Sequence, residues 1–162
     1  MTQARRRPKA PRDPYDRVAL LADTSAWIEI RKSTTSKAAK WRFDTALRRD
    51  QLFTSPIVRL ELYRGARSRV ELNEVDERLR VAEELPLSPA IASLGVGTVR
   101  ELATEGASGF HQLPVCDVLI AATAAAHGLG VLTCDWRDYQ KLAHTLGFAL
   151  FHPLKPSHYY LP

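Results

Sequence analysis

The sequence lacks any long apolar stretch. No run in its 162 residues approaches the roughly 20 apolar residues of a membrane-spanning helix. The N-terminus also lacks the apolar core of a secretory signal. Hydrophobic residues make up 45% of the chain and charged residues 25%, which is ordinary for a soluble domain. These absences predict a cytoplasmic protein with no membrane contact, and the length fits one domain with a hydrophobic core.

Cysteine and clustered histidine are scarce as well. Two cysteines, Cys116 and Cys134, cannot build a disulfide framework. They are either small residues flanking a site or a redox-sensitive pair, and the sequence leaves both open. The five histidines are scattered, without the spacing of a zinc site.

Positive charge is concentrated at the N-terminus. Residues 1–17 hold six basic and two acidic residues, so they carry four of the five net positive charges. They also contain three prolines and almost nothing apolar, which predicts a disordered basic tail before a domain over 18–162. Such a tail either adds nonspecific phosphate contacts or only aids solubility.

Continuous apolar runs alternate with helical patterns along the rest of the chain. The predicted strands are 18–23, 52–55, 85–87, 131–133 and 148–151, and the predicted helices are 24–32, 35–49, 56–65, 69–84, 89–104, 117–128 and 137–146. Strands that are apolar throughout, alternating with helices, are typical of a parallel sheet covered on both faces. The predicted fold is therefore α/β, with a mainly parallel sheet between helices.

Four carboxylates stand beside these apolar segments: Asp23, Glu61, Asp117 and Asp135. Asp23 and Asp135 follow predicted parallel strands, at the edge of the sheet where ligands bind. Asp117 starts the apolar helix that leads into the Asp135 strand. Glu61 shares one helix face with the apolar Ile57, four residues earlier. We expect the four side chains to meet at one edge of the sheet.

Each acid has a simpler explanation when it is taken alone. The three aspartates would serve as helix N-caps, and Glu61 would pair with Arg59 or Arg64. Together, converging carboxylates repel and raise one another's pKa unless a cation neutralises them. Oxygen ligands suit Mg²⁺, for which Mn²⁺ can substitute, and such an ion activates water for phosphodiester hydrolysis.

Three strings occur in an order that resembles the PIN-domain ribonucleases, and among them the VapC-type toxins of type II toxin–antitoxin pairs. They are LLADTSAWIEI, SPIVRLELYRGA and CDVLIAATAAAHGLGVLTCDWRDY, and the resemblance covers about 18–152. It implies a three-layer α/β/α sandwich and a magnesium-dependent endoribonuclease that cuts transfer or ribosomal RNA. It also implies a homodimer and a cognate antitoxin that blocks the active site.

The resemblance assigns roles to particular residues. It makes catalytic residues and metal ligands of the four acids, which are Asp23, Glu61, Asp117 and Asp135. Ser25 and Thr133 match small polar residues that support the acids. The spacing after Asp135 is wider than in the family pattern, so Asp138 is an alternative fourth acid. The antitoxin is expected to insert an Arg or Lys among the acids and to lay an apolar part on 24–32 and 35–49.

Two other functions fit parts of the sequence. A non-catalytic PIN-like module would bind RNA or protein, although the presence of all four acids argues against a degenerate site. A phosphotransfer domain with Asp23 as nucleophile lacks the second acid that it needs, because Thr24 and Ser25 stand there. Trp136, next to Asp135, is either a core residue or a surface on which a base stacks.

Overall fold

The computed structural model describes residues 18–162, and the tail predicted over 1–17 lies outside them. Helices and strands alternate along most of this part of the chain. Their bounds are β1 (Leu20–Ala22), α1 (Thr24–Arg31), α2 (Lys37–Arg48), β2 (Leu52–Thr54), α3 (Pro56–Gly65), α4 (Arg69–Leu79), β3 (Glu83–Glu84), α5 (Pro89–Thr104), a 3₁₀ turn (Phe110–Gln112), α6 (Val115–Ala126), β4 (Gly130–Leu132), α7 (Trp136–Leu146), β5 (Leu150–Phe151) and β6 (Tyr159–Tyr160). None of the helices described is long and apolar enough to cross a bilayer.

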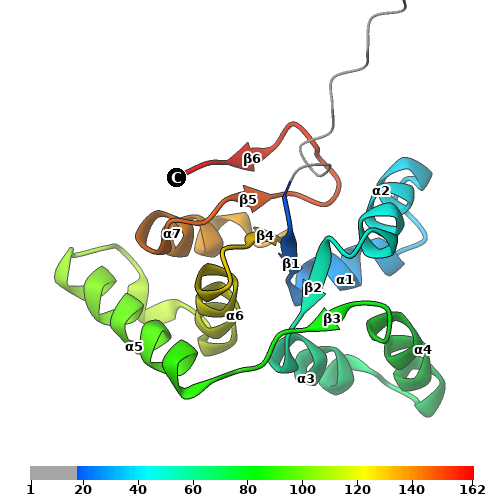
Figure 1. Ribbon diagram of the computed structural model, residues 1–162, viewed down its shortest axis with the longest axis horizontal. Helices are drawn as coiled ribbons and strands as arrows, with labels where there is room; N and C mark the ends of the chain where they lie inside the picture. The colour runs from blue at the N-terminus through cyan, green and yellow to red at the C-terminus, as the bar shows by residue number, and fades with distance from the viewer. Residues whose placement is uncertain (1–17) are drawn as a thin grey trace, which may run out of the picture.

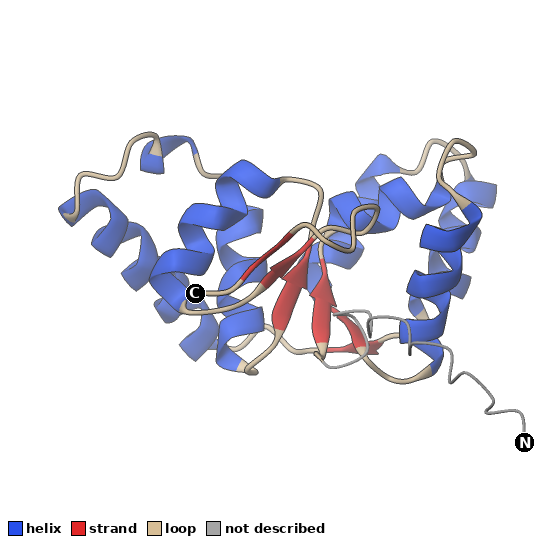
Figure 2. Ribbon diagram, turned by 90° about the horizontal axis from the view of Figure 1, so that it is seen from above, coloured by secondary structure: helices blue, strands red, loops and turns tan. Residues whose placement is uncertain are grey.

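The strands form one sheet in the order β3-β2-β1-β4-β5-β6. All neighbours pair in parallel except β5 and β6, which are antiparallel. Helices α5, α6 and α7 lie on one side of the sheet and α1 to α4 on the other (Figures 1 and 2). The predicted three-layer α/β/α architecture with a mainly parallel sheet is confirmed.

The core is centred on β1, β4 and α6. All three residues of β1 and all three of β4 are buried, because helices cover both faces of the central strands. Helix α6 is apolar on most of its surface, and α5 packs closely on it. A Cβ added at Gly95 of α5 would lie only 3.3 Å from Cγ1 of Val118. This packing fixes the start of α6 relative to the sheet.

The charged helix predicted over 69–84 is too long, and the strand predicted at 85–87 is displaced. Helix α4 ends at Leu79, and the chain then forms β3, which pairs with the end of β2. The strand is two glutamates on an exposed edge, held by backbone pairing rather than by side-chain burial. An apolar pattern therefore cannot reveal it.

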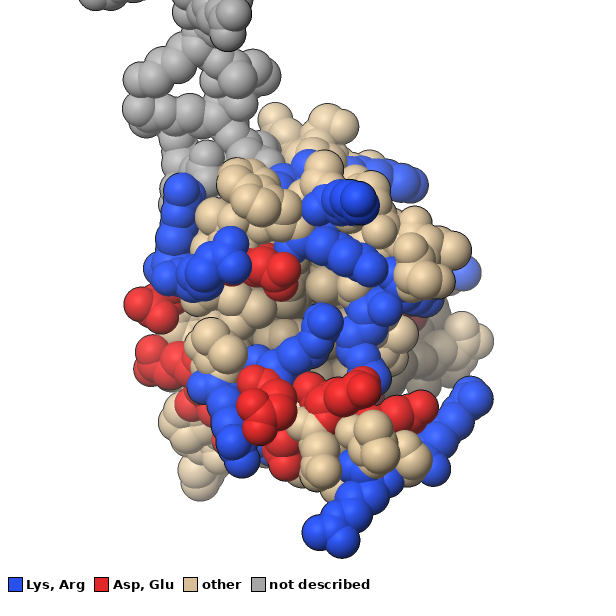
Figure 3. All heavy atoms as spheres, turned by 90° about the vertical axis from the view of Figure 1, so that its right-hand side faces the viewer, with Lys and Arg blue, Asp and Glu red and all other residues tan. Residues whose placement is uncertain are grey.

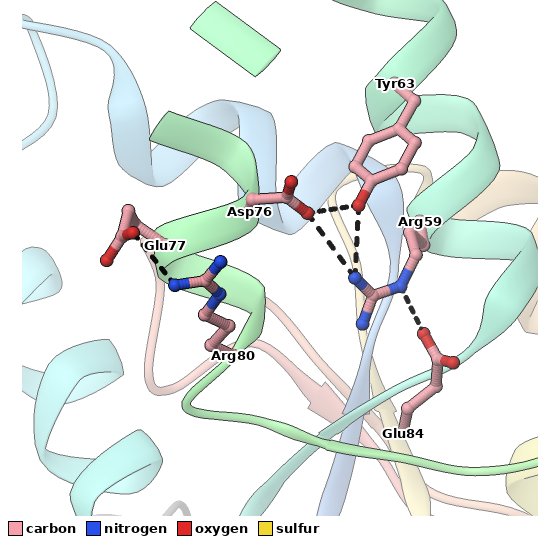
Figure 4. A network of polar contacts seen from close by, with 6 residues as sticks. All are labelled: Arg59, Tyr63, Asp76, Glu77, Arg80 and Glu84. Atoms are coloured by element: carbon pink, nitrogen blue, oxygen red, sulfur yellow. Dashed lines mark hydrogen bonds and ion pairs between the residues drawn. The ribbon is translucent and has the colours of Figure 1, made fainter. Parts of the chain in front are cut away.

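An ion-pair network fastens α4 and β3 to α3 (Figure 4). Arg59 of α3 donates from Nε to Glu84 at 2.5 Å, and its Nη1 lies 3.6 Å from Oδ1 of Asp76 in α4. Tyr63 Oη donates to Asp76 and accepts from Arg59 at 3.2 Å. Arg59 therefore anchors the helix that carries Glu61 without pairing with Glu61, which was one alternative for that acid.

Candidate active site

Asp23 lies at the centre of the candidate site. It follows β1 directly, is only 2% exposed, and caps α1 by accepting from the backbone N–H of Ser25 at 3.2 Å. Three hydroxyl groups also donate to its carboxylate: Ser25 Oγ at 2.6 Å, Thr133 Oγ1 at 3.0 Å and Tyr139 Oη at 3.0 Å. Asp23 is thus both a helix cap and a buried, fully hydrogen-bonded carboxylate. Four fixed donors leave it little freedom to rotate.

Tyr139 was not found from the sequence. It lies on the buried face of α7 and is completely enclosed. Burial, and then the negative charge of Asp23, raise the pKa of its hydroxyl well above the ordinary value, so it stays a hydrogen-bond donor. The sequence does contain a signal for this role. Tyr139 lies on the apolar face of the helix that follows Asp135, and a buried tyrosine hydroxyl needs a hydrogen-bond partner.

Thr133 and Ser25 join the ends of neighbouring strands. Thr133 Oγ1 donates to Asp23 and accepts from the backbone N–H of Asp135 at 2.9 Å. Ser25 Oγ accepts from the backbone N–H of Cys134, also at 2.9 Å. Residues 133–135 are therefore tied to the end of β1, and this places Asp135 beside Asp23.

Asp117 is held by α6, which begins two residues earlier than the prediction, at Val115 after Pro114. It therefore stands inside the first turn and is not the N-cap. Burial raises the pKa of Asp117 to about 7, and the negative charges of Asp23, Asp135, Glu61 and Asp138 follow in decreasing order as further causes. All four acids singled out from the sequence thus lie within electrostatic reach of one another.

Glu61 and Asp135 lie on either side of Asp23. Glu61, half-buried on α3, accepts a hydrogen bond from Thr24 Oγ1 at 2.5 Å. Asp135 is the N-cap residue of α7 but makes no side-chain capping bond, so capping does not account for it. Partial burial of the carboxyl group, and then the charges of Asp23, Asp138 and Glu61, raise the pKa of Asp135.

Asp138 also belongs to this environment. It lies in the first turn of α7 and raises the pKa of both Asp117 and Asp135. Its influence on Asp117 is smaller than that of Asp135. The choice of Asp135 over Asp138 as the fourth acid stays a prediction.

The cluster has no cationic partner within the described part of the chain. Every ion pair recorded there joins other residues, and no lysine or arginine pairs with any of the four acids. As the side chains stand in residues 18–162, no three acidic, His or Cys groups are gathered closely enough to hold one metal ion. For several of these acids to bind one metal ion, side chains would have to rotate, for example Glu61 away from Thr24. The all-oxygen donor set and its uncompensated charge fit a hard divalent cation.

The two cysteines flank the acids as free thiols, both half-buried. Burial, and then the neighbouring Glu61 carboxylate, raise the pKa of the Cys116 thiol. Burial, and then the charges of Glu29 and Asp135, raise the pKa of Cys134 to about 11. Both thiols are protonated at neutral pH, so they are poor metal ligands and poor nucleophiles.

Fold and site together define an α/β/α domain with a cluster of acids at the carboxyl edge of its parallel strands. The chain belongs to the PIN domain family, whose model matches residues 20–144. No curated protein matches the chain in sequence.

Several solved structures are similar to the chain. One is the DNA-bound VapBC of Salmonella typhimurium, with 22% identity and a TM-score of 0.69, over 84% of this chain and 98% of that one. FitAcB of Neisseria gonorrhoeae has 23% identity and a TM-score of 0.65, over 86% and 99%. A toxin–antitoxin complex from Klebsiella pneumoniae has 22% identity and a TM-score of 0.61, over 83% and 97%. At these identities the likeness shows the fold.

Proposed function

We propose that this protein is a magnesium-dependent endoribonuclease and the toxin of a toxin–antitoxin pair. Asp23, Glu61, Asp117 and Asp135 would be its catalytic acids and would hold the ion. The observation that carries the proposal is the gathering of the four acids, with Asp23 at the centre, at the carboxyl edge of the sheet. Burial, and then the charges of the neighbouring acids, raise the pKa of Asp117 to about 7. Membership of the PIN family supports the proposal, as do similar structures described as VapBC and as a toxin–antitoxin complex.

Each residue of the site would have its own role in phosphodiester hydrolysis. When bound, Mg²⁺ or Mn²⁺ would supply a Lewis acid for the phosphate oxygens and an activated water. Tyr139, Thr133 and Ser25 hold Asp23 in one orientation, so the central ligand is organised before substrate arrives. Asp117 and Glu61 would complete the ligand set from helices α6 and α3. Exposed Asp135 stands at the rim, where RNA would enter.

The cognate antitoxin would bind between α2 and α4. A hollow of about 350 Å³ there is lined by apolar side chains of Trp27, Phe43, Leu47 and Val81, with Arg48 and Arg78 among them. Figure 3 looks onto this face, where basic side chains gather over α2 and acidic and basic ones are mixed over α4. The expected docking surface on 24–32 and 35–49 is thereby extended to α4. A basic antitoxin residue would reach the acids along α1.

The homodimer would use the apolar side formed by α5 and α6. Val96 of α5 is 72% exposed and Val115 of α6 is 74% exposed. They line a hollow of about 400 Å³ that is mostly apolar. Isolated exposed valines are ordinary, but a continuous apolar hollow favours a contact with another surface.

Metal-dependent cleavage tests the catalytic proposal. The purified chain should cut RNA in Mg²⁺ or Mn²⁺, spare DNA of the same sequence, and lose activity in EDTA. Asp23→Asn and Asp117→Asn should each lower the rate by orders of magnitude while circular dichroism shows the fold intact. Glu101→Gln, an exposed acid of α5, is the matched control and should cleave normally. Full activity in EDTA would exclude the metal mechanism, and normal cleavage by the Asn variants would show that these acids are not catalytic. No cleavage under any of these conditions would leave a PIN-like binding module as the better description.

A further inference from the structure

Two aromatic rings extend the candidate site on the side opposite Glu61. In the strand order β2-β1-β4-β5, the segments that follow the parallel strands stand in a row along one edge of the sheet. Glu61 lies in the helix after β2, Asp23 follows β1, and Asp135 follows β4. The segment 152–158 follows β5 and is next in the row. Its start is tied to the site, because the backbone N–H of Thr133 donates to the carbonyl of Phe151 at 3.0 Å.

His158 of this segment lies against Trp136, the residue after Asp135. The two ring centroids are 4.1 Å apart, with an angle of 55° between the ring planes. Trp136 is half-buried and packs its inner side on the core, whereas His158 is exposed. The pair therefore offers an aromatic surface at the rim of the acid cluster.

Hydrogen bonds fix the turn that presents His158. Its backbone N–H donates to the carbonyl of Lys155 at 2.8 Å, and its carbonyl accepts from His152 at 3.2 Å. The ring of His152 meets that of His158 edge-on at 5.8 Å, and its Nδ1 accepts from the backbone N–H of Leu154 at 3.1 Å. A surface held in this way loses little entropy when a ligand stacks on it.

The surroundings of the ring pair select a class of ligand. Lys155 and Arg137 are exposed on the same two segments. Aromatic faces beside lysine and arginine bind unpaired nucleotides, because bases stack on the rings and phosphates meet the cations. A purely structural role for the ring pair, in the turn between β5 and β6, would not require aromatic rings next to the acids.

We propose that Trp136 and His158 form a stacking subsite for one unpaired base of the RNA, next to the phosphate cut at the acids. Lys155 would contact the neighbouring backbone phosphate. This proposal rests on the proposed ribonuclease function for its link to cleavage, but the subsite itself can be tested by binding alone.

Tryptophan fluorescence reports on this subsite directly. Trp27 is buried and Trp41 is 63% exposed, so the full chain carrying Trp41→Phe and Asp117→Asn leaves Trp136 as the responsive ring. A uridine decamer should quench it, and an abasic decamer of the same length should not. His158→Ala should weaken decamer binding roughly ten-fold, and His158→Phe should restore it. His127→Ala, at the far end of α6, should change nothing.

The outcomes separate the subsite from the catalytic function. Equal quenching by the abasic decamer, no quenching at all, or undiminished binding by His158→Ala would overturn the subsite. In a chain with Asp117 intact, His158→Ala should raise KM for single-stranded RNA while leaving kcat nearly unchanged. Cleavage with an unchanged KM would overturn the subsite and leave the ribonuclease standing. Base-dependent quenching in a protein that cuts no RNA would support the subsite and refute the ribonuclease.

Discussion

At the scale of single residues, the site depends on how a buried negative charge is satisfied. Asp23 has no cationic partner in the described structure and relies on hydroxyl and backbone donors. Its position could be anticipated because it follows an apolar strand, whereas Ser25 and Thr133 were expected beside the acids from the resemblance to the PIN family. Tyr139 could not be anticipated, because it is 116 residues away and its contact depends on how α7 is rotated against the sheet.

Removing the Tyr139 hydroxyl should destabilise the protein. Tyr139→Phe deletes one donor to a buried carboxylate while keeping the ring that fills the core. We expect the free energy of unfolding to fall by about 1.5–3 kcal/mol, as for hydrogen bonds to charged groups. Urea denaturation measures this, with Tyr159→Phe as the exposed control. Equal stability of the two variants would show that the bond to Asp23 contributes little.

The raised pKa of Asp117, caused by burial and then by the neighbouring acids, predicts a pH-dependent stability in metal-free buffer. Its pKa is about 7 in the folded protein, against an ordinary value of 3.8. The folded state therefore holds this proton more tightly than the unfolded state does. The stability from this group is fully present below about pH 3.8 and is lost as pH rises through about 7.

Asp117→Asn should prevent the loss of stability at high pH, because the amide carries no charge at any of these pH values. The melting temperature of the variant should exceed that of the unsubstituted chain at pH 8, by about 2–4 °C for each kcal/mol regained. The gap should narrow at pH 5. Thermal unfolding in EDTA at both pH values measures this difference in melting temperature. A difference that is the same at pH 5 and pH 8 would show that ionisation of Asp117 is not its cause.

At the scale of helices and strands, sequence patterns succeed where one residue type determines the geometry. The helices predicted over 56–65 and 89–104 both begin where expected, with Ser55 and Ser88 as N-caps and proline in the first turn. No hydrophobic pattern predicts β6, because this strand is two tyrosines paired with β5 through the backbone. Its register depends on β5 and on the turn between them.

Two glycines should respond to alanine in opposite directions. A Cβ at Gly130 in β4 would meet Leu20 Cδ2 at 2.9 Å and the carbonyl oxygen of Ala149 at 3.0 Å. Gly130→Ala should therefore push β4 away from its neighbours and cost about 1–3 kcal/mol. At Gly97 in α5 nothing lies within 4 Å, so Gly97→Ala should stabilise the helix by about 0.5–1 kcal/mol. Urea denaturation compares the stability of the two variants. If Gly130→Ala leaves the free energy of unfolding unchanged, β4 can move slightly away from its neighbouring strands without loss of stability.

At the scale of the whole molecule, α1 connects the acid cluster with the hollow between α2 and α4. Asp23 caps the start of α1, and Trp27, one turn further on, lines that hollow. The two places are one helical turn apart, about 6 Å along the helix. One short peptide can therefore fill the hollow and still reach the acids. The three acids that surround Asp23 come from α3, α6 and the end of β4, so their expected convergence followed from the sheet topology and not from spacing along the chain.

This geometry leads to a prediction about the proposed antitoxin. Val81 lines the hollow and is 57% exposed, so Val81→Asp should fold normally and weaken the antitoxin complex at least ten-fold. Nuclease activity of the free variant should be unchanged, because Val81 lies away from the acids. Val96→Asp is the matched control on α5, across the sheet, and should bind the antitoxin normally.

Calorimetric titration of each variant with the antitoxin measures the affinity. Replacing the antitoxin's inserted basic residue with Ala should restore RNA cleavage in the complex, because an arginine fork among carboxylates would otherwise occupy the site. If Val81→Asp binds the antitoxin as tightly as Val96→Asp does, the antitoxin does not bind in the hollow between α2 and α4. Inhibition that persists without the basic residue would show that the acids are blocked in some other way.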